Sequence, residues 1–144
     1  MAIAAIHETL LTYTWRKSTL AREISELQSY KTLALMEQGD VNAMFNAKKS
    51  DIKDFYKHLY NTDDTYAQYK DYTEIPDFKD AMDRIDAEMQ DELDRIAAWE
   101  REIDAQITTK DTELQEINAY TESMKTMRSS NIQEDFNFGL GGGG

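Results

Sequence analysis

The sequence predicts an all-α fold, namely an elongated antiparallel helical hairpin or coiled coil of N- and C-terminal helices with a small helical middle segment. Two observations on spacing and helix breakers predict this fold, and a third, on cysteine, limits the possible chemistry. Apolar residues recur every three or four positions at both ends of the 144-residue chain. Only two strong helix breakers, Gly39 and Pro76, precede residue 138. The absence of cysteine excludes disulfides, thiolate metal sites and thiol nucleophiles.

The N-terminal helix is predicted over about residues 2–38. Its apolar positions alternate steps of three and four without a slip, which is the repeat of a coiled-coil seam. The ten positions are Ile3, Ile6, Leu10, Tyr13, Lys17, Leu20, Ile24, Leu27, Lys31 and Ala34. The two lysines either specify the register or partner of the seam, or lay their stems along it and extend their amines to solvent. Gly39 followed by Asp40 predicts the end of this helix.

The first six residues, Met-Ala-Ile-Ala-Ala-Ile, are apolar on every side of a helix. A helix that is apolar all round requires burial all round. One hairpin cannot provide this at a terminus. We therefore expect this end either to fray or to be buried by neighbouring subunits.

A middle helix over about 41–60 is predicted from Val41, Phe45, Ile52 and Leu59, and is followed by a turn or loop over about 61–76. Five of the eight tyrosines lie between residues 56 and 72. Tyrosine suits packed but hydrated surfaces, because its ring is buried while its hydroxyl stays wet. The cluster is either an exposed interaction face or, as we favour, a small cap on the hairpin.

The C-terminal helix is predicted over about 77–128, beginning near Pro76, which suits a first helical turn. A second set of residues comes one position later than a strict heptad requires, as Leu93, Ile107 and Leu114. The resulting face is broader than a two-stranded seam and predicts contact with more than one helix. The strict series reads Met82, Met89, Ile96, Ile103, Lys110, Ile117 and Met124.

These helices and the loop form one predicted domain over 1–128. Residues 129–144 are predicted to be a tail, because Ser129, Ser130 and Asn131 end the helical pattern and a short aromatic strip and glycines follow. The strip contains Phe136 and Phe138.

Charge and composition narrow the possible partners. The net charge is −12, which disfavours nucleic acid and anionic lipid, and residues 77–128 contribute −8 from fifteen acidic and seven basic residues. We expect no membrane span, since no apolar run approaches the required length, and no secretory signal is visible. The chain is expected in an extracellular appendage without a cleaved signal peptide if it is a filament subunit, and otherwise in the cytoplasm.

No pattern for catalysis or metal binding emerges. His7 and His58 lack the spaced partners of zinc or di-iron helices. The acidic stretch from Asn61 to Tyr72 lacks the glycine and closing glutamate of a calcium loop. We therefore expect no enzyme activity, no cofactor, no metal and no small-molecule substrate.

The plan of two heptad-patterned terminal helices around a small middle piece resembles the axial proteins of flagellar and type III secretion systems, which include needle, filament and flagellin-core subunits. The resemblance is architectural. It implies terminal helices that pair antiparallel and stack helically around a channel. The segment from Leu10 to Lys17 also resembles the start of some short uncharacterised helical bacterial proteins.

Two functions follow as hypotheses. The first is a self-assembling structural protein, a subunit of a helical filament or tube built by coiled-coil packing, with itself as partner. The second is a cytosolic coiled-coil adaptor, chaperone or scaffold that forms a small oligomer. Replacing Ile3 and Ile6 by Asp is expected to abolish assembly only in the first case. The expected assembly-interface residues are Ile3, Ile6, Leu10, Leu11, Trp15, Leu20, Ile24, Leu27, Met82, Ile85, Met89, Ile96, Trp99, Ile103, Ile117, Met124, Phe136 and Phe138.

Overall fold

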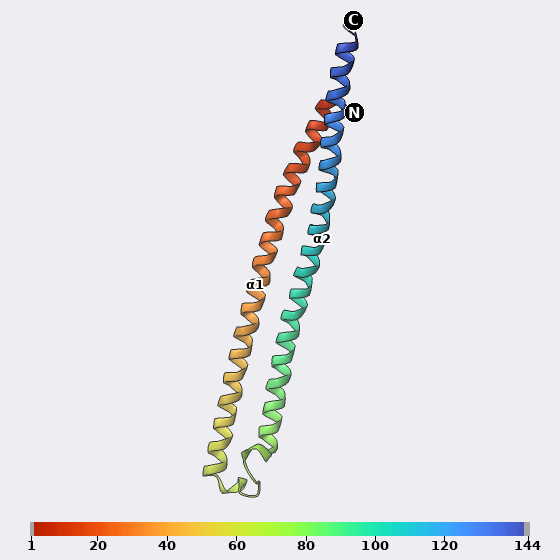
Figure 1. The fold of residues 1–144 in the computed structure, drawn as a ribbon. Coiled ribbons are helices and arrows are strands. Elements are labelled where there is room, and N and C mark those ends of the chain that lie inside the picture. Colours follow the sequence, from red (N-terminus) through yellow and green to blue (C-terminus); the bar gives the residue numbers. More distant parts are fainter. Residues whose placement is uncertain (1, 143–144) are drawn as a thin grey trace. The chain divides into compact units, whose positions relative to one another are not determined.

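A computed structural model of the chain describes the backbone of residues 2–142 and the side chains of residues 2–136. It contains two long helices, α1 (Ile3–Thr62) and α2 (Pro76–Gly142). Two short 3₁₀ helices, η1 (Asp64–Tyr66) and η2 (Tyr72–Glu74), lie between them (Figure 1). No strand occurs within residues 2–142. The predicted all-α helical hairpin is thereby confirmed.

Contacts divide the hairpin into two units, each of which pairs a segment of α1 with a segment of α2. The terminal unit joins α1 up to Tyr30 with α2 from Ile103 onward, and the loop unit comprises Lys31–Glu102. Because each unit has two helical segments, each has a single contact seam. The predicted extent of one domain over 1–128 stays a prediction.

The seam of the terminal unit uses the heptad positions of the N-terminal pattern. Ile6 and Leu20 of α1 are fully buried, and Ile103 and Ile117 of α2 are at most 7% exposed. Fully burying such a side chain contributes about 1.5–3 kcal/mol. The apolar stripe of this part of α1 is therefore satisfied within the chain.

The core of the loop unit is a small cluster of Ala34, Val41, Phe45 and Ile96. Phe45 is 3% exposed, and Ala34 is fully buried. The half-buried residues packed against this cluster, all from α2, are Ile85, Met89, Leu93 and Trp99.

The helix break predicted at Gly39 is wrong. The residues of the predicted helices 2–38 and 41–60 are helical, but they form the single helix α1. Gly39 has no left-handed backbone conformation. The heptad stays in phase across it, because Ala34 and Val41 are seven residues apart and both buried. Burying two such residues outweighs the roughly 1 kcal/mol that glycine costs inside a helix.

The predicted turn is present, and two aspartates organise it. The Asp63 carboxylate accepts hydrogen bonds from the Thr65 amide at 3.0 Å and the Thr65 hydroxyl at 2.6 Å. Asp71 accepts from the amide of Thr73 at 2.8 Å and also from its hydroxyl. Each carboxylate caps a 3₁₀ helix, and these hydrogen bonds lower the pKa of both aspartates.

The tyrosines of this region hold the loop against the helices. The Tyr60 hydroxyl lies 3.1 Å from the Tyr69 carbonyl and 3.0 Å from the Lys70 carbonyl, and it can donate to only one of them at a time. The rings of Tyr56 and Tyr72 pack edge-on against Phe78, with centroids 5.6 and 5.3 Å away. The cluster is thus a cap on the hairpin, as favoured from the sequence.

The helix α2 begins at Pro76, as predicted, but it does not end near residue 128. The expected tail over 129–144 is wrong as far as Gly142, because the backbone stays helical to that residue. Half-buried positions continue the seam spacing through Met124, Arg128 and Asn131. Extending a formed helix fixes one residue per hydrogen bond, which is far less costly than starting a new one.

Candidate functional site

Chain packing already covers much of the predicted assembly interface. Four of its residues are exposed: Ile3, Leu11, Trp15 and Phe136. The side chain of Phe138 lies outside the described residues. The buried members are Ile6, Leu10, Leu20, Leu27, Ile96, Ile103 and Ile117, and the half-buried members are Ile24, Met82, Ile85, Met89, Trp99 and Met124. A heptad repeat identifies an apolar stripe but not whether its own chain or another covers it.

The broad face of α2 also has an explanation within the chain. In the loop unit, the buried and half-buried residues are spaced by four residues twice in succession, whereas a heptad alternates steps of three and four. Such a spacing is called a stutter. The steps are Val41, Phe45 and Lys49 on α1 and Ile85, Met89 and Leu93 on α2. Since Val41 and Phe45 pack with these α2 residues, the two shifts face each other. Within the loop unit, the late residue Leu93 therefore does not require a second neighbouring helix.

Two interhelical ion pairs set the register of the terminal unit. The Arg16 guanidinium binds both carboxylate oxygens of Glu113, with Nε and Nη2 at 2.8 and 3.0 Å. Lys110, the polar member of the strict series, donates to Glu23 at 2.5 Å. That hydrogen bond and the Lys110 charge lower the pKa of Glu23. These pairs were not predicted from the sequence. The only signal for them there was the presence of charged residues such as Lys110 within an apolar series.

In the loop unit, Lys49 of α1 forms a salt bridge with Asp86 of α2. The Lys49 side chain is 23% exposed, whereas that of Asp86 is 54% exposed. Lys17 and Lys31, the interruptions of the first seam, are both half-buried. Half-burial suits a stem that lies along the seam with its amine towards solvent.

Large apolar side chains remain uncovered outside the seams. Trp15 is 79% exposed, Phe136 65% and Met36 61%. Such residues occur singly on ordinary surfaces, but here they recur along both helices. The exposed apolar residues that the predicted assembly interface did not include are Tyr30, Leu33, Leu35, Met36, Met44, Phe55, Tyr120, Met127 and Ile132.

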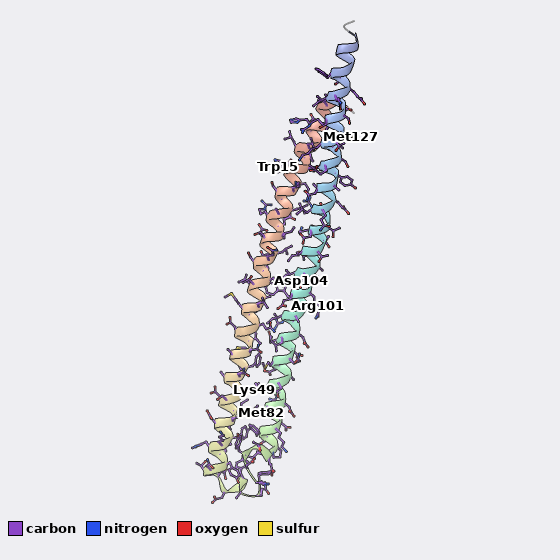
Figure 2. The ribbon with its side chains drawn as sticks, viewed as in Figure 1. Trp15, Lys49, Met82, Arg101, Asp104 and Met127 are labelled. Carbon is purple, nitrogen blue, oxygen red and sulfur yellow. The ribbon has the colours of Figure 1, made fainter. Side chains whose placement is uncertain are left out.

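The most exposed of these residues, Trp15, is carried by α1 (Figure 2), and it lines a shallow hollow. We call the surface made by Leu11, Trp15, Ser18, Thr19 and Arg22 the Trp15 face. Each member lies three or four residues from another member, so they share one side of the helix. The hollow is lined by Thr14, Trp15, Ser18, Thr19 and Arg22.

A second hollow, in the loop unit, combines apolar and acidic groups. Met44 and Phe45 contribute apolar surface, and the Lys48 amine lies 4.9 Å from the Phe45 ring centroid. Glu88, Asp91 and Glu92 supply the acidic rim from α2. This arrangement suits an amphipathic segment that carries basic residues.

Groups suited to metal or membrane chemistry are not apparent in the described part of the chain. No cluster of three or more potential metal ligands occurs within it. None of its helices combines the length and apolar character needed to cross a bilayer. His7 and His58 are both exposed. The expectation of no enzyme activity stays a prediction.

Comparisons with protein-family models, with curated proteins and with solved structures return no match.

Proposed function

We propose that this chain is a structural, self-assembling protein, a subunit of a helical filament or tube built by packing of helix faces. The supporting observation is the exposure of large apolar side chains that neither unit covers, above all Trp15 and Phe136 in the terminal unit. Covering such surface contributes roughly 25 cal/mol per Å². A second copy of the chain offers complementary helix faces of the same kind.

The apolar N-terminus supports this proposal less directly than the sequence suggested. Ile6 is fully buried in the seam of its own chain, and Ile3 is 36% exposed. Replacing both by Asp would put a charge into the hairpin seam, so a loss of assembly could reflect unfolding. Trp15 is the better position, because its side chain is exposed before any second copy binds.

The proposal is tested by sedimentation velocity and electron microscopy of the purified chain over a hundredfold range of concentration. Growth into particles without a fixed size supports it. Trp15→Ser is expected to weaken this growth, whereas Thr12→Ser, an exposed change on the same helix, leaves it unaltered. A monomer at every concentration overturns the proposal.

A second candidate function is a coiled-coil adaptor or scaffold that forms a small oligomer. The acid-rimmed hollow of the loop unit favours it, because Glu88, Asp91 and Glu92 border the apolar Met44 and Phe45. A fixed dimer or tetramer that does not grow with concentration supports this candidate. Its hollow should then bind a basic amphipathic helical peptide, and Glu88→Lys together with Asp91→Lys should weaken that binding at least tenfold.

A further inference from the structure

The C-terminal end of α2 extends past the start of α1 within the terminal unit (Figure 1). Tyr13 stacks on Tyr120 with centroids 6.1 Å apart, and Glu23 pairs with Lys110. In both antiparallel pairs the two residue numbers add up to 133. By the same rule Ile3 is level with about residue 130 of α2. Among the described residues, only α2 continues beyond this level.

We call residues 131–142 of α2 the C-terminal overhang. It spans about three helical turns, or roughly 18 Å. Ile132 and Phe136 are one turn apart on the same side of the helix and are 51% and 65% exposed. Glu134 and Asp135 make the segment acidic, and no basic residue follows Arg128. The overhang is thus an acidic helix with an apolar pair.

The Trp15 face has matching properties. From Leu11 to Arg22 it spans about 16 Å of helix. It also presents an apolar pair one turn apart, Leu11 and Trp15, which are 55% and 79% exposed. Its far end carries the cation Arg22, whose side chain is 69% exposed and lies 3.8 Å from Glu26. An exposed pair at this distance contributes little, so Arg22 is able to meet another carboxylate.

We propose that the C-terminal overhang of one copy docks on the Trp15 face of a second copy. The inference rests on the proposed self-assembly and names the two surfaces that meet. Ile132 and Phe136 pack against Leu11 and Trp15. Glu134 and Asp135 lie between the two apolar residues of the overhang and make it negative. Arg22, about 10 Å beyond Trp15 along α1, adds positive charge to the Trp15 face.

A second copy is required because the chain cannot make this contact with itself. The overhang begins beyond the level of Ile3, whereas Trp15 lies twelve residues further along α1 in the opposite direction, about 18 Å away. The overhang is the uninterrupted end of α2 and points away from the start of α1 (Figure 1), so the helix would have to break for the overhang to turn back. Its own Trp15 face is out of reach.

Charge decides between the Trp15 face and a second overhang as the partner. Two paired overhangs would bring Glu134 and Asp135 of each copy close together, and like charges in an interface are costly. The Trp15 face instead offers Arg22. The contact therefore joins two different surfaces. Such a heterologous contact leaves one free surface of each kind and propagates unless the arrangement closes into a ring.

Two variants test the contact by complementation. Trp15→Asp removes the face but keeps the overhang, and Phe136→Asp removes the overhang but keeps the face. Each alone should remain monomeric at concentrations where the unaltered chain associates. Mixed in equal amounts, they should form a particle of twice the 16.7 kDa chain mass and nothing larger. Sedimentation velocity reads the masses, and circular dichroism confirms that each variant keeps its helix content.

The matched control is Met36→Asp, which replaces an exposed apolar residue of the loop unit and should associate like the unaltered chain. Association of the unaltered chain and of both test variants overturns this inference but not the proposed function. The same holds if both variants are monomeric and their mixture stays so. If the unaltered chain is itself monomeric at all concentrations, both proposals fail.

A cross-link locates the contact directly, because the chain contains no cysteine. Leu11→Cys in one copy and Ile132→Cys in another, at two positions that the proposed contact pairs, should form a disulfide under mild oxidation, which needs α-carbons about 4–7 Å apart. The mixture should yield the cross-linked dimer at least tenfold faster than either variant alone. Equal rates in all three samples contradict the inference.

Discussion

Thr121 is 6% exposed within the seam of the terminal unit, and its hydroxyl has no hydrogen-bond partner within the described structure. Threonines elsewhere on α2 donate to the carbonyl four residues earlier, as Thr126 does to Glu122 at 3.0 Å. A buried hydroxyl without a partner loses its hydration and gains nothing in return. Thr121 is therefore a local weakness in an otherwise apolar seam.

We expect Thr121→Val to raise the free energy of unfolding by about 1 kcal/mol, because a methyl group replaces an unsatisfied hydroxyl of similar size. Urea unfolding followed by circular dichroism measures the change. Thr126→Val is the control, since that residue is exposed and should change stability little. A clear loss of stability in Thr121→Val would indicate that the hydroxyl has a partner in solution.

Glu23 makes the stability of the terminal unit depend on pH. The hydrogen bond from Lys110 lowers the pKa of Glu23 in the folded chain. A carboxyl group with a lowered pKa contributes stability that is present above its unfolded pKa and lost as the pH falls through its folded pKa. Its contribution is therefore complete at neutral pH and absent in acid.

Glu23→Gln is expected to lower the unfolding temperature at pH 7, and the difference from the unaltered chain should shrink as the pH falls below about 4.3, the pKa of an unfolded glutamate. Thermal unfolding at closely spaced pH values measures this difference. Glu8→Gln, at an exposed position of α1, controls for the change in net charge. A difference that stays constant down to pH 3 contradicts the assigned ion pair.

At the scale of the element, Gly39 shows why α1 is one helix. Its backbone is helical and lies at an exposed position. A β-carbon added there meets nothing within 4 Å. The glycine is consequently a tolerated weak point of α1 and not a structural requirement.

Gly39→Ala should stabilise the chain by roughly 1 kcal/mol, because alanine is the better helix former and fits without contact. Ala47→Gly, an exposed change in the same helix, should destabilise it by a similar amount. Thermal unfolding measures both. If Gly39 ended a helix in the left-handed conformation, Gly39→Ala would instead lower the unfolding temperature.

At the scale of the whole molecule, stability is linked to association. A copy that binds only folded chains raises the unfolding temperature as the protein concentration increases. A tenfold increase in concentration adds at most about 1.4 kcal/mol, or about 3–6 °C for a chain of this size. Differential scanning calorimetry should show this rise for the unaltered chain and none for Phe136→Asp. An unfolding temperature independent of concentration in both argues against assembly.

Several elements were predictable because local rules determine them. Pro76 begins α2 as its fixed backbone angle suggests, and the turn cluster after Asn61 forms the loop. The N-terminal heptad correctly identified Ile6 and Leu20 as buried. The break at Gly39 was mispredicted because glycine was weighed by its local propensity, while the phase between Ala34 and Val41 carried the stronger signal.

The uncovered surfaces were less predictable. The expected interface included Trp15 and Phe136, which are exposed, but also Leu20 and Ile117, which the chain itself covers. The apolar spacing along one helix cannot distinguish exposed residues from residues buried by the other helix, since it describes one helix at a time. The overhang was missed because Ser129 and Asn131 indicated the end of a helix, whereas α2 continues.

The sequence by itself determined the helical class, the apolar side of each helix and the position of the loop, because these depend on spacing and propensity along one chain. Only the tertiary structure decided which apolar stripe is buried by the other helix and where α2 extends past the start of α1. A shift of seven residues leaves a heptad seam equally apolar, so periodicity leaves the register open. Specific pairs such as Arg16 with Glu113 and Glu23 with Lys110 settle it, and they exist only once two helices lie side by side.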